Sequence, residues 1–164
     1  MDKETYPDQR VVVLSKDFVF VKVNAKEDSL TKKQFHIFGT PTIIVARPNG
    51  EEIDRIVGFH SAPEFVSKIK DYKKGKNTLG DLENKVSKKP KDVNLLYTLG
   101  DKHQGRGNYD RAVELYKQIL SVDPENKRFK SDSAAFNLAS IKYRQKDFLG
   151  AVSEFEKFKA TYSN

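Results

Sequence analysis

Two spacings of apolar residues divide the chain. Within the first part, apolar side chains form runs of strand length at 18–24, 42–46 and 52–57, and the last run alternates apolar and polar positions. From residue 62 onward apolar residues recur at helical intervals, first on a helix expected from Ala62 to about Tyr72. The pattern predicts an α/β unit at 1–74 and an all-α unit at 75–164, joined through a lysine-rich linker at 73–77.

The stretch from Phe38 to Val45 organises the first unit. Gly39 gives a permissive backbone, and Pro41 fits the first position of a strand because proline has no N–H for a ladder. The β-branched run that follows suits a strand buried on both faces. Residues 48–50 then turn the chain into the alternating strand at 52–57.

Short helical pieces fill the rest of this unit. Residues 1–16 are predicted to form two short helical pieces separated at Pro7, and Asp8 can cap the second piece. The apolar side of that second piece is predicted to carry Val11, Val12 and Leu14. A further short helix, capped by Asp28 or Ser29 and carrying Leu30, is predicted to run towards Phe35.

The motifs Gly39–Thr42, Asn49–Gly50 and Arg55–Phe59 follow one another in the order strand, turn, strand, glycine, helix. Over residues 1–73 this order resembles the C-terminal half of a thioredoxin-like domain. The resemblance implies a cis Thr40–Pro41 bond, and a loop at these two residues that pairs with an extended peptide beside redox cysteines. The chain contains no cysteine, so it cannot carry out thiol chemistry by itself.

The resemblance also implies one strand between the runs at 18–24 and 42–46, and no sequence is left for it. We expect either direct pairing of these runs, which would bury Val19, Val21, Ile43 and Val45, or association of two copies through exposed sheet edges. A further alternative is that the chain is a fragment of a thiol–disulfide oxidoreductase whose Cys-x-x-Cys segment lies upstream of Met1. A genomic sequence that encodes an in-frame Cys-x-x-Cys motif before the Met1 codon would favour that alternative.

The second half repeats itself. The first copy has Leu96–Gly100, Ala112 and Tyr116, followed by Asp123–Pro124. The second copy has Ala135–Ala139, Ala151 and Phe155, and Ala112 lies 39 positions before Ala151. This pattern resembles tetratricopeptide repeats, whose unit is about 34 residues of helix–turn–helix, with an insertion at 127–131. Small residues are predicted to let paired helices approach, and aromatic residues to fill the space between them: Gly100, Ala112, Ala139 and Ala151, then Tyr109, Tyr116, Phe148 and Phe155.

The first helix of each such repeat lines a concave groove in proteins of this type. By that resemblance the groove would present Asn94, Tyr97, Asp101, Gln104, Phe136, Ser140 and Tyr143 to a protein or peptide ligand. The family's carboxylate clamp has lysine and asparagine where this chain has Tyr97 and Asp101, and Asn137 alone matches it. A purely structural array is the alternative.

The end of the second repeat lacks a capping helix in this sequence. Exposure of Val152, Phe155 and Phe158 is therefore expected, with homodimer formation through the uncapped end as one alternative.

Composition excludes several other classes of function. The net charge of +7 comes mainly from lysine runs in linkers, without the arginine clusters or modules typical of nucleic-acid binding. No apolar run reaches the length of a membrane span, and no signal peptide is evident. His36, His60 and His103 lack metal-ligand spacing, and no catalytic or cofactor motif occurs. The sequence predicts a protein-interaction module without redox cysteines.

Overall fold

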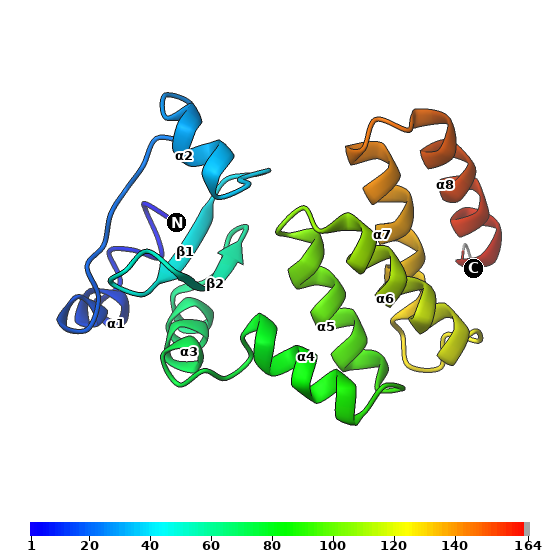
Figure 1. Ribbon diagram of the computed structural model, residues 1–164, viewed down its shortest axis with the longest axis horizontal. Coiled ribbons are helices and arrows are strands. Elements are labelled where there is room, and N and C mark those ends of the chain that lie inside the picture. Colours follow the sequence, from blue (N-terminus) through cyan, green and yellow to red (C-terminus); the bar gives the residue numbers. More distant parts are fainter. Residues whose placement is uncertain (163–164) are drawn as a thin grey trace. The chain divides into compact units, whose positions relative to one another are not determined.

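The computed structural model describes residues 1–162, which form two compact units (Figure 1). The first unit extends from Met1 to Asp81 and the second begins at Leu82. The predicted fold class is confirmed, since an incomplete α/β unit precedes a unit of helical hairpins. The predicted domain boundary at residue 74 stays a prediction.

The first unit begins with turns, followed by α1 (Gln9–Val12) and the 3-10 helix η1 (Val13–Lys16). Asp8 caps α1 by accepting the N–H of Arg10 at 2.9 Å, as predicted. Hydrogen bonds from the side chain and backbone of Arg10 lower the pKa of Asp8 to about 2. Val11 and Leu14 are buried, but Val12 is 45% exposed, so its predicted place on the apolar side is wrong.

The sheet has two antiparallel strands among the described residues, β1 (Thr42–Ala46) and β2 (Glu52–Val57). Their register runs from Thr42 opposite Val57 to Ala46 opposite Glu52, with a bulge after Val45. The connecting turn closes with Gly50 at φ 85°, a conformation that glycine adopts without steric cost. The bond between Thr40 and Pro41 is cis, as the resemblance implied.

The expected strand at residues 18–24 is not formed. These residues, which we call the extended segment, run from α1 to α2 (Ser29–Gln34) apart from β1 (Figure 1). Direct pairing, one of the two expected outcomes, therefore does not occur, and the burial of Val19 and Val21 that it would bring is wrong, since they are 93% and 79% exposed. Association of two copies stays a prediction. Val45 is buried and Ile43 is half-buried. A single extended stretch needs a neighbouring strand to satisfy its backbone, and none of residues 1–162 forms a strand beside this one.

The core of the first unit lies between the sheet and α3 (Ala62–Lys73). Phe65 is fully buried there and packs edge-on against Tyr6, with ring centroids 6.0 Å apart. Long-range hydrogen bonds join the pieces, such as the Thr5 hydroxyl donating to the carbonyl of His60 at 2.7 Å. The predicted apolar face of α3 is confirmed by the burial of Phe65, Val66, Ile69 and Tyr72.

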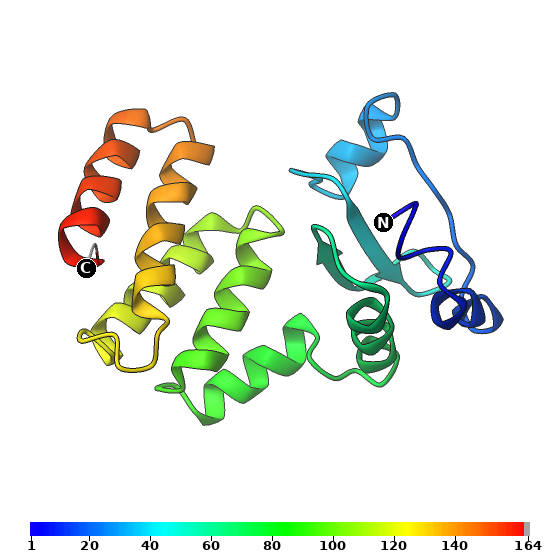
Figure 2. The same ribbon diagram turned by 180° about the vertical axis from the view of Figure 1, so that it is seen from behind.

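The second unit is built from helical hairpins, seen from both sides in Figures 1 and 2. Helix α4 (Leu79–Lys88) leads into the hairpin of α5 (Val93–Gln104) and α6 (Tyr109–Val122), and a second hairpin follows from α7 (Ser131–Arg144) and α8 (Phe148–Tyr162). Each hairpin packs its two helices closely, and α6 also packs on α7.

Close approach of α5 and α6 depends on Gly100. A Cβ atom at this position would lie only 2.8 Å from Cε1 of Tyr116, which is fully buried. Ala112, Ala139 and Ala151 are also buried at the helix contacts, as predicted. Phe148 was predicted to fill the second hairpin, but it lies at the surface and packs edge-on against Tyr143 with ring centroids 5.6 Å apart.

Candidate functional site

The helical unit has a pocket of about 370 Å³ between its hairpins. Tyr97 reaches it from α5 and Phe158 from α8, whereas four residues come from the first two turns of α7. Residues spaced four apart on a helix share one face, and this places the α7 side chains together. The α7 residues are Asp132, Ser133, Phe136 and Asn137.

Aromatic rings form one wall of this pocket. Phe136 packs edge-on against Phe155 and Phe158, with centroids 5.5 and 5.8 Å away. Phe136 nevertheless stays 48% exposed, so a large apolar surface faces solvent at the pocket. The expected exposure of Val152 is confirmed, but Phe155 and Phe158 are half-buried because they pack against Phe136.

Polar side chains from three helices meet beside the aromatic wall. The Tyr116 hydroxyl shares its one proton between Gln104 Oε1 at 2.8 Å and Asp101 Oδ1 at 3.1 Å. Asn137 Nδ2 donates to the Tyr97 hydroxyl at 3.3 Å and approaches Asp101 Oδ1 at 3.5 Å. These contacts join α5 to both α6 and α7, and they fix the position of Tyr97 at the pocket.

The electrostatic environment of the pocket is mainly negative. Burial and the nearby Asp101 carboxylate raise the pKa of Tyr97, and the same causes raise the pKa of Tyr116 above its usual range. Asp132 adds a second carboxylate to the lining. The Lys130 ammonium lies 4.9 Å from the centre of the Tyr97 ring, and this cation–π contact holds the ammonium over that ring.

The structure brings together only some of the residues predicted for the groove. Tyr97 and Phe136 line the pocket, and Asp101 and Gln104 belong to the polar network next to it. Asn94 lies exposed at the start of α5, and Tyr143 contacts Phe148 at the other end of α7. Neither Asn94, Ser140 nor Tyr143 is among the pocket-lining residues.

Sequence reasoning missed Asp132, Ser133 and Phe158 as lining residues. The helical spacing of Asp132, Ser133, Phe136 and Asn137 could have shown that one face of α7 is shared. No such signal exists for Phe158, because the pocket uses the second helix of the hairpin as well as the first.

Thr40 and Pro41, the other predicted peptide-binding residues, lie in the loop before β1 in the first unit. The Pro41 carbonyl accepts the N–H of Gly58 at 2.9 Å, and the Thr42 hydroxyl donates to the carbonyl of Gly39 at 2.7 Å. Thr40 is exposed. The loop thus presents backbone at the surface, and its predicted role in peptide binding stays a prediction.

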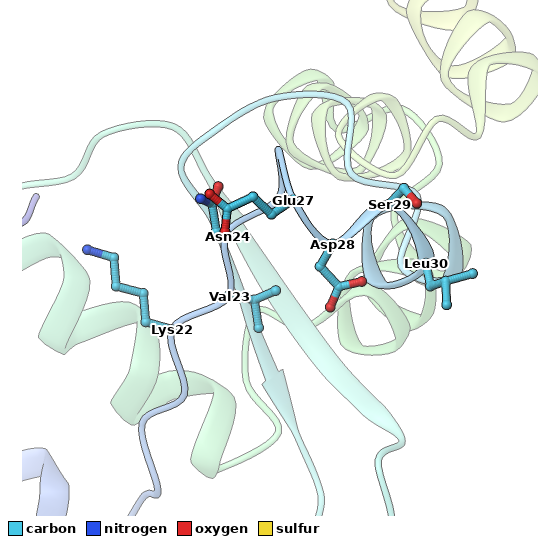
Figure 3. Close-up of a pocket in the computed structure, with 7 residues that line it drawn as sticks. All are labelled: Lys22, Val23, Asn24, Glu27, Asp28, Ser29 and Leu30. Carbon is cyan, nitrogen blue, oxygen red and sulfur yellow. The ribbon is translucent and has the colours of Figure 1, made fainter.

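A second hollow, of about 530 Å³, lies where the extended segment meets α2 (Figure 3). Lys22, Asn24 and Asp28 in its lining already have local hydrogen-bond partners. Asp28 caps α2 by accepting the N–H and hydroxyl of Thr31, both within 2.8 Å, and these hydrogen bonds lower its pKa. Lys22 donates to Asp2 at 2.7 Å. This lining therefore serves the local fold and presents no catalytic arrangement.

Two further features of residues 1–162 bear on other classes of function. No group of three or more histidine, aspartate or glutamate side chains is arranged to hold a metal ion. None of the helices in this range combines the length and apolarity needed to cross a membrane.

Comparisons with known proteins agree with the architecture. Residues 1–73 match the family model described as a thioredoxin-like domain, and residues 93–126 match the model of a tetratricopeptide repeat. The chain is also 33% identical over 73 residues to the thiol:disulfide interchange protein DsbD from two strains of Campylobacter jejuni. This alignment covers 42% of the present chain and 13% of each relative.

The chain thus spans about an eighth of the length of these relatives. It combines an incomplete thioredoxin-like domain with tetratricopeptide-type hairpins, as the resemblance predicted. Because it has no cysteine, it cannot form a mixed disulfide by itself.

Proposed function

We propose that the chain is a protein-interaction module whose helical unit binds a peptide segment in the pocket between α5, α7 and α8. The observation that carries this proposal is the half-exposed Phe136 beside a fixed polar network. Binding hot spots are enriched in aromatic residues that become desolvated in a well-packed pocket when the partner binds. The exposed ring supplies the apolar contact area, and Tyr97 and Asn137 supply directional hydrogen bonds.

The charges around the pocket favour a cationic side chain of the ligand. Asp132 lines the pocket and Asp101 lies beside it, whereas Lys130 is engaged over the Tyr97 ring. An arginine side chain of a partner could stack on Phe136 while its guanidinium approaches Asp132. We therefore propose a peptide that carries arginine next to apolar residues.

Labelled nonapeptides that differ only at the central residue test this proposal. We expect the arginine peptide to bind most tightly and the glutamate peptide least tightly, measured by fluorescence anisotropy. Phe136→Ala should weaken binding of the arginine peptide by about tenfold, in the range typical of a contact worth 1–2 kcal/mol.

Two charge variants give a matched comparison. Asp132→Asn should remove the preference for arginine over glutamate, because it removes the carboxylate that lines the pocket. Asp110→Asn, on the exposed first turn of α6, should leave the preference unchanged. Equal binding of all peptides by the parent chain, or equal effects of the two variants, would contradict the proposal.

A redox-related role is the second candidate, and the similarity of residues 1–73 to thiol:disulfide interchange proteins favours it. In that role the present segment would position a thiol–disulfide partner whose cysteines come from elsewhere. The purified chain should show no insulin reduction or disulfide isomerisation above a buffer blank, because exchange requires a thiolate. Activity above the blank would contradict this account.

A further inference from the structure

The loop at residues 123–130, which joins α6 to α7 in Figure 1, is fixed by hydrogen bonds from buried side chains. The carboxylate of Asp123, a buried residue, accepts the N–H groups of Lys127 at 3.0 Å and Arg128 at 2.8 Å. The hydroxyl of Ser131, which is fully buried, donates to the Asp123 carbonyl at 2.6 Å. These bonds hold a surface loop in one defined shape.

Phe129 is the large apolar residue that this loop exposes. Its φ angle is 53°, in the left-handed region that bulky residues rarely adopt, and its N–H donates to the Asn126 carbonyl at 3.1 Å. The ring is 77% exposed, so burial of the ring does not account for this conformation. Unusual backbone conformations that the surrounding structure enforces are typical of functional positions.

The cations next to Phe129 differ in how they are engaged. Lys127 pairs with Glu125 at 2.7 Å, and Lys130 lies over an aromatic ring of α5. Arg128 is exposed directly beside Phe129. The loop therefore presents an arginine next to an apolar ring, which is the combination proposed above for the ligand of the pocket.

We propose that Arg128 and Phe129, which together we call the loop anchor, bind the pocket of a second copy of the chain. The inference rests on the proposed function, because it uses the same pocket. In this arrangement Phe129 packs on the half-exposed Phe136 ring, and the Arg128 guanidinium approaches the Asp132 carboxylate. The pocket volume of about 370 Å³ is large enough for one aromatic side chain.

The structure keeps the loop anchor out of the pocket of its own copy. Phe129 stays exposed there, and the bonds from Asp123 fix the backbone that carries it. The anchor and the pocket are neighbours, since Asp132 lines the pocket and follows Phe129 by three residues. Two copies related by a two-fold axis therefore make the contact twice, and the assembly closes as a dimer.

Sedimentation velocity of the intact chain tests the proposal. Because the contact is small, we expect a monomer–dimer equilibrium between about 10 µM and 1 mM. Phe129→Asn should weaken the dimer by about tenfold or more, since it removes the ring while asparagine suits the left-handed backbone. Leu149→Asn, which replaces an 87% exposed residue on α8, should leave the dimer unchanged. Circular dichroism should show that both variants keep the fold.

An exchange of charges tests the pairing of Arg128 with Asp132. Arg128→Glu alone and Asp132→Arg alone should each weaken the dimer, because like charges then meet at both contacts. An equal mixture of the two variants should recover it, since both contacts of a mixed dimer pair opposite charges. The mixture also controls for damage to the loop or to α7, because a misfolded variant would not be rescued.

Three results would overturn the proposal. One is a chain that stays monomeric up to about 1 mM. Another is a dimer that Leu149→Asn breaks and Phe129→Asn does not, since the dimer would then form through the uncapped end of the second hairpin. The third is a mixture of the charge variants that associates no better than either variant alone.

The nonapeptide measurements separate this inference from the proposed function. Binding of the arginine nonapeptide by a chain that stays monomeric would overturn the self-association alone. A dimer that depends on Phe129, in a chain that binds none of the nonapeptides, would support the self-association and contradict the peptide proposal. Where both hold, the arginine nonapeptide should dissociate the dimer, because the two ligands compete for one pocket.

Discussion

The thioredoxin-like unit and the helical unit satisfy their backbone in different ways. Each helix of the second unit closes its hydrogen bonds within itself, so the hairpins need only side-chain packing to join. The sheet of the first unit needs a neighbour for every strand, and β1 has one on a single side. An isolated two-stranded hairpin is marginally stable, which makes the packing of α3 against the sheet decisive.

The contacts that hold each unit together also differ between the two units. In the first unit, hydrogen bonds between residues far apart in sequence join the pieces, as from Thr5 to His60 and from the Leu79 N–H to Asp54. In the second unit, a buried apolar seam follows the helix repeat, with Leu96, Leu99 and Leu115 almost fully buried. A helical hairpin satisfies its backbone hydrogen bonds by itself, whereas a strand in a sheet also needs a strand beside it.

The largest expected effect concerns the core of the first unit. Phe65→Ala should lower its unfolding free energy by about 3–5 kcal/mol, because it leaves a cavity where the fully buried ring packs. We expect the methyl signals of Val45 and Ile56 to lose dispersion at lower urea concentration. Val19→Ala removes exposed surface only and serves as the control. If both variants had equal urea midpoints, the core assigned to this unit would be wrong.

Two glycine variants sharpen the account of helix packing. Gly100→Ala should destabilise the helical unit by about 1–3 kcal/mol, because the new Cβ would meet the buried Tyr116 ring at 2.8 Å. Gly80→Ala in α4 meets no atom within 4 Å and should be neutral or stabilising by up to about 1 kcal/mol. Urea unfolding followed by circular dichroism measures both. Stabilisation by both changes would show that α5 and α6 are not held this close.

Two threonine variants compare a long-range hydrogen bond with a local one. Thr5→Val keeps the shape of the fully buried Thr5 side chain but leaves the half-buried His60 carbonyl without its donor, at a cost of about 1–2 kcal/mol. Thr98→Val removes a bond from an exposed hydroxyl to the Asn94 carbonyl in the preceding helix turn, and we expect about 0.5 kcal/mol or less. Thermal unfolding of the two variants should therefore differ. Equal shifts would mean that the Thr5 bond does not hold the N-terminal turns.

The smallest expected effect is a pH dependence from His103. This residue is 5% exposed, and burial, partly offset by Glu83 and reinforced by Arg111 and Arg106, lowers its pKa in the folded state. The unfolded chain then binds a proton near pH 6.5 that the folded chain resists, so stability should fall as the pH decreases below about 7.

A His103→Leu variant provides the comparison for that titration. It lacks the proton-binding group, and its urea midpoint should change less between pH 8 and pH 5.5 than that of the parent chain. Neither ring nitrogen of His103 has a hydrogen-bond partner within the described residues. The Glu83 carboxylate, 3.6 Å from Nε2, is about half exposed, so the replacement leaves no buried partner of the imidazole unpaired. Parallel pH profiles of the two proteins would contradict the assignment.

Sequence predicted the helices and the β-hairpin well because their signals are local. Asp8, Asp28, Pro41 and Gly50 act on neighbouring residues, and helix spacing of apolar residues reports burial directly. The extended segment shows where this reasoning ends. Its β-branched pattern is that of a strand, but pairing depends on a partner that the segment's own sequence does not specify.

The candidate pocket, too, could be predicted only in part from the sequence. Tyr97 and Phe136 followed from the repeat, because the first helix of each hairpin faces the groove. Ser140 and Tyr143 do not line the pocket, because the pocket uses the first turns of α7 rather than its whole length, and their predicted role in peptide binding stays a prediction. Phe158 belongs to the lining because Phe136 turns towards α8, a packing choice between side chains that helix spacing does not encode.

The buried hydroxyl of Tyr116 gives the helical unit an optical reporter of its own. The chain has seven tyrosines and no tryptophan, so near-ultraviolet absorbance at alkaline pH records phenol ionisation alone. Burial and the Asp101 carboxylate raise the pKa of Tyr116 far above its usual range, so this phenol should lose its proton only when α5 and α6 separate. An absorbance step at high pH in an alkaline titration would show the pH at which that hairpin opens, without any label.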